Sequence, residues 1–155
     1  KSYPIMFHLN DELFVILNRR SDTVGSHKGE ICFPGGKMDE NDPDLMFTAL
    51  RELKEEIGLE PEHVELINST DDWLRYWLPK RYIRQNKGPL CIGQKQIWYL
   101  LKLTADETYF DLSYASEPEF DSWKWVDFWR PAEEVISFKR EVYQQALKQL
   151  QPFIL

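Results

Sequence analysis

One segment in the first half of the chain constrains the fold most, because it carries a helix start signal, a helix stop signal and two contrasting faces. Asp42 and Pro43 are typical of a helix start, since an aspartate caps backbone N–H groups and a proline is tolerated at the first helical position. Gly58 directly follows Ile57 and is typical of a helix stop. We therefore predict a helix over residues 43–57.

The predicted helix has an apolar face and an acidic face. The apolar positions recur at helical spacing and comprise Met46, Leu50, Leu53 and Ile57. Glu52, Glu55 and Glu56 stand at i, i+3 and i+4, so their carboxylates converge where repulsion would cost stability unless cations bind. Ligands that are all oxygen favour Mg²⁺ or Mn²⁺. A solvated acidic face is the simpler alternative, because charge runs usually lie at the surface.

Short apolar runs predict strands on both sides of this helix. Residues 3–9 and 13–19 flank Asn10, Asp11 and Glu12, which predicts a hairpin. Further strands are predicted at residues 30–33, 64–69, 95–103 and 123–128, and further helices at residues 131–136 and 138–149. Helices would then pack on a mixed β-sheet, so we expect an α+β fold in the form of an α/β/α sandwich.

The length and the composition fit one soluble domain. At 155 residues the chain can bury one substantial core, so we expect a single domain over residues 1–155. Hydrophobic residues make up 43 % and charged residues 29 %, and no stretch reaches the length of a membrane span. Cys32 and Cys91 are too few for a disulfide framework and match no metal-ligand spacing. We therefore expect a cytoplasmic protein with two reduced thiols and no membrane partner.

The charge is unevenly distributed along the chain. A net charge of −7 argues against a protein that coats nucleic acid non-specifically, because phosphate binding needs clustered cations. Residues 73–95 nevertheless contain no carboxylate. They carry Arg75, Lys80, Arg81, Arg84, Lys87 and Lys95. This run predicts either a surface that meets a polyanion or a solvated loop.

The acidic helix and the loop before it resemble the Nudix hydrolase signature, G-x5-E-x7-R-E-U-x-E-E-x-G-U, in which U is aliphatic. Residues 51–59 match every fixed position of its second half, and a Phe-Pro-Gly-Gly stretch at residues 33–36 precedes them. The first half departs from the signature, since Gly35 to Arg51 is two residues longer than usual. The first glutamate, which is chiefly structural in the family, has no counterpart at residues 40–42.

The resemblance implies an enzyme that hydrolyses phosphoric anhydride bonds at a divalent-metal site. The Gly35 carbonyl, Glu52, Glu55 and Glu56 would hold Mg²⁺ or Mn²⁺ against a substrate diphosphate and promote in-line attack by water. Glu56 is therefore expected to be a catalytic residue as well as a ligand. Arg51 is expected to orient the carboxylates rather than to touch the substrate.

Other parts of the chain resemble the bacterial RNA 5′-pyrophosphohydrolases of this superfamily. The matching stretches are residues 72–76, 78–81, 91–96, 118–121 and 137–140, with Trp123, Trp125, Val142 and Tyr143. The resemblance implies that Glu119 completes the metal site or acts as general base, and that Lys139 contacts phosphate. It also implies that Phe138 stacks on a nucleobase with Tyr76 nearby. The alternatives are a surface position for Glu119 and core packing for the two aromatic residues.

The N-terminal third resembles another branch of the superfamily. Arg20 with Ser21, followed by the Phe-Pro-Gly-Gly stretch at residues 33–36, is similar to the motif of coenzyme A diphosphatases. This similarity implies that Arg19 and Arg20 bind substrate. Gly25 stands where that motif has an arginine, and the glutamine that the RNA enzymes carry between proline and glycines is absent. The chain is thus expected to be a chimera or a divergent member.

Three functions follow from these features. The leading one is conversion of 5′-triphosphorylated or 5′-diphosphorylated RNA ends to 5′-monophosphate, a step in RNA 5′-end processing and mRNA decay. The alternative enzyme is a diphosphatase of coenzyme A or another nucleoside diphosphate derivative. A non-catalytic RNA or nucleotide sensor is the third function, and it would need degraded metal ligands, whereas Glu52, Glu55 and Glu56 are present.

Overall fold

Helices and strands alternate irregularly along the computed structural model, which describes residues 3–8, 14–20, 30–33, 35–83, 90–114, 118 and 120–154. The helices are α1 (Leu45–Ile57), α2 (Arg130–Glu134) and α3 (Arg140–Leu150). Single turns of 3-10 helix are η1 (Pro61–His63), η2 (Lys80–Tyr82), η3 (Glu107–Tyr109), η4 (Ser137–Lys139) and η5 (Gln151–Phe153).

The strands form three groups. They are β1 (Tyr3–His8), β2 (Phe14–Arg20), β3 (Ile31–Cys32), β4 (Gly35–Gly36), β5 (Val64–Ser69), β6 (Leu74–Trp77), β7 (Gly93–Gln96), β8 (Tyr99–Leu103) and β9 (Phe120–Asp127). The hydrogen-bonded orders are β4-β1-β8-β5, β3-β2-β9 and β6-β7. Because β1 runs parallel to β8 and antiparallel to β4, the first group is a mixed sheet, as predicted.

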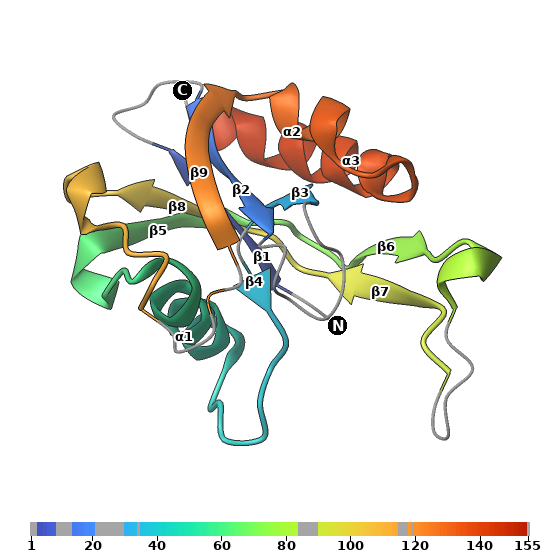
Figure 1. The fold of residues 1–155 in the computed structure, drawn as a ribbon, viewed down its shortest axis with the longest axis horizontal. Coiled ribbons are helices and arrows are strands. Elements are labelled where there is room, and N and C mark those ends of the chain that lie inside the picture. The colour runs from blue at the N-terminus through green and yellow to red at the C-terminus, as the bar shows by residue number, and fades with distance from the viewer. Residues whose placement is uncertain are drawn as a thin grey trace.

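Strand β8 is buried on both sides and separates two apolar cores. Leu100 packs in the core that α3 covers, whereas Tyr99, Leu101 and Leu103 pack in the core that α1 covers. This alternation is the one expected for a strand with helices on both faces. Figure 1 shows α1 below the strands and α2 and α3 above them. The predicted α+β fold with α/β/α layers is therefore confirmed.

The acidic helix begins and ends at well-defined caps. The Asp44 carboxylate accepts a hydrogen bond from the Phe47 N–H at 2.8 Å, which satisfies one of the free donors of the first turn. Gly58 ends α1 with φ of 75°, and its N–H donates to the Lys54 carbonyl. The predicted stop is confirmed. The prediction that Asp42 is the cap was wrong, because α1 begins at Leu45 and the Asp42 carboxylate accepts hydrogen bonds from Asp39, Thr48 and Arg51 instead.

Two predicted strands exist but do not form the predicted hairpin. β1 pairs with β4 and β8, and β2 pairs with β3 and β9, so the two strands lie in different sheets. The predicted turn at Asn10, Asp11 and Glu12 lies outside the described residues. The local sequence signal could not show that each strand pairs with strands from other parts of the chain.

The predicted strand over residues 95–103 is two strands, because the chain leaves the ladder at Trp98. The Trp98 N–H donates to the Thr70 hydroxyl at 3.1 Å, and its carbonyl accepts from the Thr70 N–H at 2.9 Å. The indole N–H of Trp98 donates to Gln96 Oε1 at 2.9 Å, so this fully buried side chain has its polar atom satisfied. The break lets β7 pair with β6 in a hairpin of its own.

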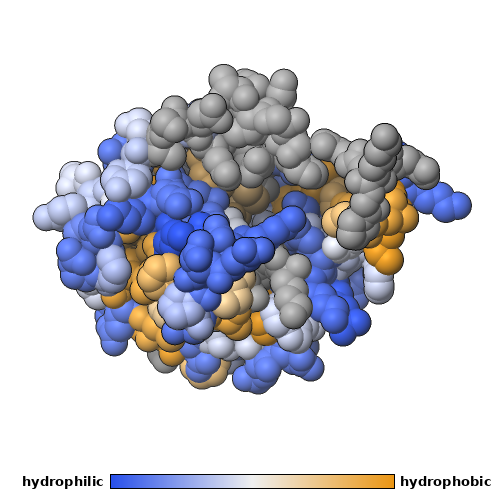
Figure 2. All heavy atoms as spheres, turned by 90° about the horizontal axis from the view of Figure 1, so that it is seen from below, coloured by the Kyte–Doolittle hydropathy of each residue, from blue (hydrophilic) through white to orange (hydrophobic). Residues whose placement is uncertain are grey.

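The helices of the described residues are short and amphipathic, and none of them has the length and apolar character to cross a membrane. On the side of the molecule that carries α1, hydrophilic residues cover much of the surface beside smaller hydrophobic patches (Figure 2). The charged face of α1 and the exposed loop at residues 37–41 belong to the polar part of the molecule. The candidate site lies where this loop meets the helix.

Candidate functional site

Arg51 joins the acidic face of α1 to the loop that precedes it. Its guanidinium donates to both oxygens of Asp42 at 3.1 and 2.9 Å and to the Lys37 carbonyl at 3.0 Å. It also donates to Glu52 at 2.9 Å and to Glu55 at 3.4 Å. One cation therefore contacts two of the three predicted ligand carboxylates, and the orienting role expected of Arg51 stays a prediction.

Asp42 is the buried anchor of this arrangement. Its side chain is 2 % exposed, and it also accepts from the Thr48 hydroxyl at 2.9 Å and the Asp39 N–H at 2.8 Å. The hydrogen bonds from Arg51 are the main reason that the pKa of Asp42 falls from 3.8 to about 2. The same pairing raises the pKa of Arg51 above its ordinary value. Both groups are therefore charged over the whole physiological range.

Glu56 is tied to the glycine loop. Its carboxylate is buried, and Oε2 accepts a hydrogen bond from the Gly35 N–H at 2.8 Å. A buried carboxylate is stable only with hydrogen bonds or a cation, so this position is suited to a ligand. The contact also holds Gly35 next to the acidic helix, and the carbonyl of this residue is a predicted metal ligand.

Gly36 gives Glu52 the room that it needs. A Cβ at this position would overlap the Glu52 carboxylate, so a larger residue would displace it. β4 holds the two glycines in place by pairing Gly35 with Pro4 and Gly36 with Tyr3 of β1. The close approach of backbone to carboxylate is a task for glycine, which has no side chain.

The loop and α1 enclose an open cleft of about 610 Å³. It is lined by Gly35, Gly36, Lys37, Met38, Asp39, Glu40, Arg51, Glu52 and Glu56. Glu55 does not line the cleft, and its side chain is 54 % exposed. Carboxylate and carbonyl oxygens are the donors that hard divalent cations prefer, so the chemistry of the donor set fits Mg²⁺ or Mn²⁺.

The carboxylates are not arranged around a common point in this structure. No three His, Cys, Asp or Glu side chains within the described ranges have a geometry that could hold a metal ion. Arg51 occupies oxygens of Glu52 and Glu55, and the Gly35 N–H occupies one of Glu56. Glu119, the remaining predicted ligand and base, lies outside the described residues. The metal site therefore stays a prediction.

The predicted nucleobase wall is an aromatic cluster at the junction of β6, η2 and η4. The Phe138 ring lies 5.7 Å from Tyr76 and 5.1 Å from Tyr82, measured between centroids. Lys139 Nζ lies 5.6 Å from the centre of the Tyr76 ring and 5.9 Å from that of Phe138. The structure thus brings together the three residues that the sequence predicted to act jointly.

The two predicted wall residues differ in exposure. Tyr76 is only 7 % exposed and belongs to the core, and burial raises the pKa of its hydroxyl. Phe138 is half-buried and packs on the edge of the same core. Part of the Phe138 ring is therefore accessible to a ligand, whereas Tyr76 is buried and packs against Phe138.

Arg19 and Arg20, the other predicted substrate contacts, lie at the end of β2. A register shift in the pairing with β9 falls between them. Their side chains lie outside what the structure describes, so their role in binding stays a prediction. Ser21 of the coenzyme A diphosphatase motif, and Gly25, which stands in place of the motif's arginine, lie outside the described residues as well.

Comparison with known proteins decides the family. The NUDIX domain matches residues 4–146. The chain belongs to the Nudix family. Members of this family typically depend on a divalent metal ion, which agrees with the oxygen donors on α1 and with the Nudix signature at residues 51–59.

Two similar proteins are both named RNA pyrophosphohydrolase. The one from Thioalkalivibrio sulfidiphilus (strain HL-EbGR7) is 55 % identical over 124 residues, which are 79 % of this chain and 70 % of the relative. The one from Pseudoalteromonas atlantica (strain T6c / ATCC BAA-1087) is 52 % identical over 128 residues, 83 % of this chain and 72 % of the relative. The match thus covers 70 % and 72 % of the length of these two relatives.

Solved structures support the fold alone, because their sequences are distant. The dihydroneopterin triphosphate pyrophosphohydrolase of E. coli has a TM-score of 0.69 at 19 % identity, covering 93 % of this chain and 92 % of that one. A C. elegans Ap4A hydrolase has a TM-score of 0.65 at 18 % identity, covering 99 % and 98 %. Both have the Nudix layers described above.

Asp42 is the residue that sequence reasoning missed. The first glutamate of the signature has no counterpart by spacing, yet Asp42 makes the bond to Arg51 that holds the loop against the helix. The signal was the Asp42 carboxylate, close to where the signature has its first glutamate, and it was interpreted as a helix cap.

Proposed function

We propose that this Nudix protein is a metal-dependent hydrolase that converts 5′-triphosphorylated or 5′-diphosphorylated RNA ends to 5′-monophosphate. The observation that carries the proposal is the identity of more than half over about four-fifths of the chain with relatives named RNA pyrophosphohydrolase. The retained acidic helix supports an active enzyme rather than a sensor, since Glu52, Glu55 and Glu56 are all present.

The residues of the cleft have distinct roles in this proposal. Glu52, Glu55, Glu56 and the Gly35 carbonyl would hold Mg²⁺ or Mn²⁺, which when bound neutralises the phosphates and lowers the pKa of water. Arg51 keeps the carboxylates turned toward the cleft. Glu56 stays oriented by the Gly35 N–H, at 2.8 Å. Arg51 and Glu56 are thus held by contacts within the fold before substrate arrives.

The bond changes are those of anhydride hydrolysis. The oxygen of a water forms a bond to phosphorus, the P–O bond to the leaving phosphate or pyrophosphate breaks, and one proton of the water passes to a carboxylate base. We assign the base to Glu119, on the resemblance to the RNA enzymes. The products are an RNA 5′-monophosphate and either pyrophosphate or, one at a time, phosphate.

The predicted nucleobase wall beside β6 supports RNA as the substrate class. Phe138 offers an aromatic surface and Lys139 a cation close to it, which suits a base and its phosphate in single-stranded RNA. The N-terminal features favour coenzyme A or another nucleoside diphosphate derivative as the alternative substrate, with Arg19 and Arg20 as contacts. A chimera or a divergent member of the family would account for that mixture.

Product analysis tests the proposal. A 5′-triphosphorylated RNA is incubated with the protein and Mg²⁺, and then with an exonuclease that degrades only 5′-monophosphorylated RNA. We expect the RNA to become sensitive to the exonuclease, and excess EDTA to prevent the change. An RNA that stays resistant under all metal conditions would contradict the proposed function.

A further inference from the structure

The hairpin of β6 and β7 has one face that the core does not use. Leu74 and Tyr76 of β6 are buried, whereas Arg75 and Trp77 alternate with them and are exposed. In the antiparallel register Arg75 lies opposite Lys95, and Trp77 lies opposite Gly93. Arg75, Trp77 and Lys95 therefore share one side of the hairpin, which we call the outer hairpin face.

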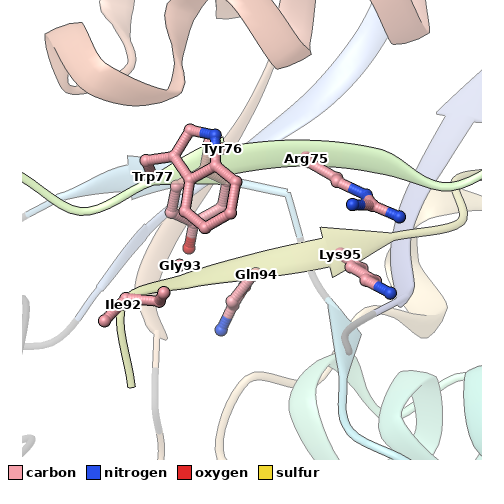
Figure 3. Close-up of a pocket in the computed structure, with 7 residues that line it drawn as sticks. All are labelled: Arg75, Tyr76, Trp77, Ile92, Gly93, Gln94 and Lys95. Carbon is pink, nitrogen blue, oxygen red and sulfur yellow. The ribbon is translucent and has the colours of Figure 1, made fainter. Parts of the chain in front are cut away.

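Two like charges stand directly opposite each other on this face. Arg75 and Lys95 are both exposed, and the structure shows no ion pair for either one among the residues it describes. Figure 3 shows the two side chains next to each other at the end of the hairpin nearer the body of the protein. Like charges at such a cross-strand pair are destabilising, so a bound anion would relieve the repulsion.

An aromatic surface lies beside the cation pair. The side chain of Trp77 is 64 % exposed, and its cross-strand neighbour Gly93 has no side chain to cover it. A Cβ on Gly93 would overlap the Tyr76 carbonyl, so the hairpin needs glycine there. The strands line a hollow of about 310 Å³ at this place (Figure 3).

The segment that forms the hairpin is positively charged, although the protein as a whole is acidic. Residues 73–95 contain six cations and no carboxylate, while the whole chain has a net charge of −7. Lys80 and Arg81 of η2, which follows β6 at the outer end of the hairpin, are exposed (Figure 1). An exposed aromatic side chain among cations is the combination with which proteins bind single-stranded nucleic acid.

We propose that the outer hairpin face binds the RNA downstream of its 5′ end, with Arg75 and Lys95 on phosphates and Trp77 stacked on a base. The proposal rests on the proposed function, since it extends the same substrate. Tyr76 turns to the opposite side of β6, toward Phe138. The RNA would therefore contact the aromatic cluster with its first bases and cross β6 to reach the outer hairpin face.

A binding measurement tests this surface without any need for hydrolysis. The probe is an RNA of about 12 nucleotides with a 5′-hydroxyl, a length within the reach of such surfaces, and the readout is fluorescence anisotropy at several salt concentrations. We expect the double variant Arg75→Gln, Lys95→Gln to bind about tenfold more weakly. The slope of log K against log salt should fall by about 1.4, or about 0.7 for each lost phosphate contact.

Substitutions at Trp77 separate stacking from charge. Trp77→Ala should weaken binding by about five- to a hundredfold, because one base loses its stacking partner. Trp77→Phe should retain most of the affinity. The matched control for Lys95→Gln is Lys148→Gln, which removes an exposed lysine from α3. The control should leave both the affinity and the salt slope unchanged.

Two outcomes would overturn the inference. One is equal RNA affinity of the wild type and the double variant, which would also be the result if the face served a protein partner. The other is an equal loss in Lys148→Gln. Turnover distinguishes a wrong RNA-binding face from a wrong proposed function. If the face and the function are both correct, the double variant loses about tenfold more kcat/KM on a long triphosphorylated RNA than on a triphosphorylated dinucleotide. A wild type that cleaves neither RNA contradicts the proposed function alone.

Discussion

At Arg51 one guanidinium meets three carboxylates that differ in exposure. The side chains of Asp42, Glu52 and Glu55 are 2 %, 15 % and 54 % exposed. The contact with Asp42 is shielded from water and adds hydrogen bonds, so it is the strong one, whereas the contact with Glu55 is weak. Arg51 can therefore stay on Asp42 when a cation attracts the glutamates, and the helix face can open without losing the loop.

Asp42 gives a prediction on stability and pH. Its native pKa of about 2 lies below the ordinary 3.8, so its contribution is complete above about pH 4 and is lost as the pH falls toward 2. The free energy of unfolding of Asp42→Asn should therefore be below that of the wild type at pH 7, and the difference should shrink on acidification. Urea unfolding at several pH values measures it.

The control is Asp44→Asn, because asparagine caps a helix about as well as aspartate does. It makes the same chemical change two residues away and should leave stability nearly unaltered. A constant difference between the wild type and Asp42→Asn down to pH 2 would show that the Asp42 charge is not what holds Arg51.

The ligand carboxylates give a prediction on activity. Glu56→Gln should lower Mg²⁺-dependent turnover by at least about a hundredfold, in line with the several kcal/mol that a metal ion supplies. Glu55→Gln should have the same kind of effect. The fold should remain, since a glutamine oxygen can still accept from the Gly35 N–H. The exposed Glu62→Gln on η1 is the matched control. Near-normal turnover of Glu56→Gln in saturating Mg²⁺ would refute the metal-site assignment.

Among the elements, β4 illustrates what a two-residue strand can do. It pairs with β1 and sets Gly35 and Gly36 against α1, so the backbone of the loop lies beside Glu52 and Glu56. Gly36→Ala should displace the Glu52 carboxylate and lower Mg²⁺ affinity by about ten- to a hundredfold, as the loss of supporting contacts commonly does. Mg²⁺ titration of activity measures the change. Unaltered Mg²⁺ dependence would mean that Glu52 is no ligand.

The cluster between β6 and η4 gives a prediction that separates packing from binding. Phe138→Leu keeps an apolar side chain against Tyr76 and Tyr82 but removes the aromatic face. It should cost about ten- to a hundredfold in kcat/KM for RNA and less for a mononucleoside triphosphate, which lacks the next base. The melting temperature should change little. Equal losses on both substrates with a lower melting temperature would mean that Phe138 is only a core residue.

Lys139→Ala is expected to behave differently from Phe138→Leu. Loss of one phosphate contact should weaken RNA cleavage at low salt and make it less sensitive to added salt, with a slope smaller by about 0.7. Rates at several salt concentrations measure this. An unchanged slope would place Lys139, whose Nζ lies 5.9 Å from the centre of the Phe138 ring, in a structural role alone.

Local signals predicted elements better than their partners. Pro43, Gly58 and the spaced leucines were enough to predict α1 to within two residues, because caps and amphipathic faces are short-range properties. Strands β1 and β2 were predicted in place, but their pairing depends on β4, β8, β3 and β9, which no local pattern reveals. β6 was missed because its four residues alternate only twice. The spacing of the acidic residues left both a metal site and a solvated face open, and the resemblance to Nudix proteins favoured the metal site.

At the scale of the whole molecule, the sandwich places the residues proposed for catalysis and those proposed for recognition on different layers. α1 and β4 carry the carboxylates and the glycines on one side of the strands, while η4 and α3 lie with the other core. The β6-β7 hairpin extends from the body beside them (Figure 1). A substrate that contacts the acidic helix, the Phe138 cluster and the hairpin needs a phosphate chain, a base and a further polyanionic segment. RNA with a 5′-triphosphate has each of these.

The measurement that tests this account most directly is the ratio of kcat/KM for a 5′-triphosphorylated RNA to kcat/KM for coenzyme A, at the same Mg²⁺ concentration and with Glu56→Gln as the blank. The RNA has bases for the Phe138 cluster and phosphates for the cations, whereas coenzyme A has one nucleotide. We expect the RNA to be preferred by about tenfold or more, since each extra base contact contributes about 1–3 kcal/mol. A clear preference for coenzyme A, lost in Glu56→Gln, would contradict the assignment of RNA as the substrate while retaining the Nudix hydrolase.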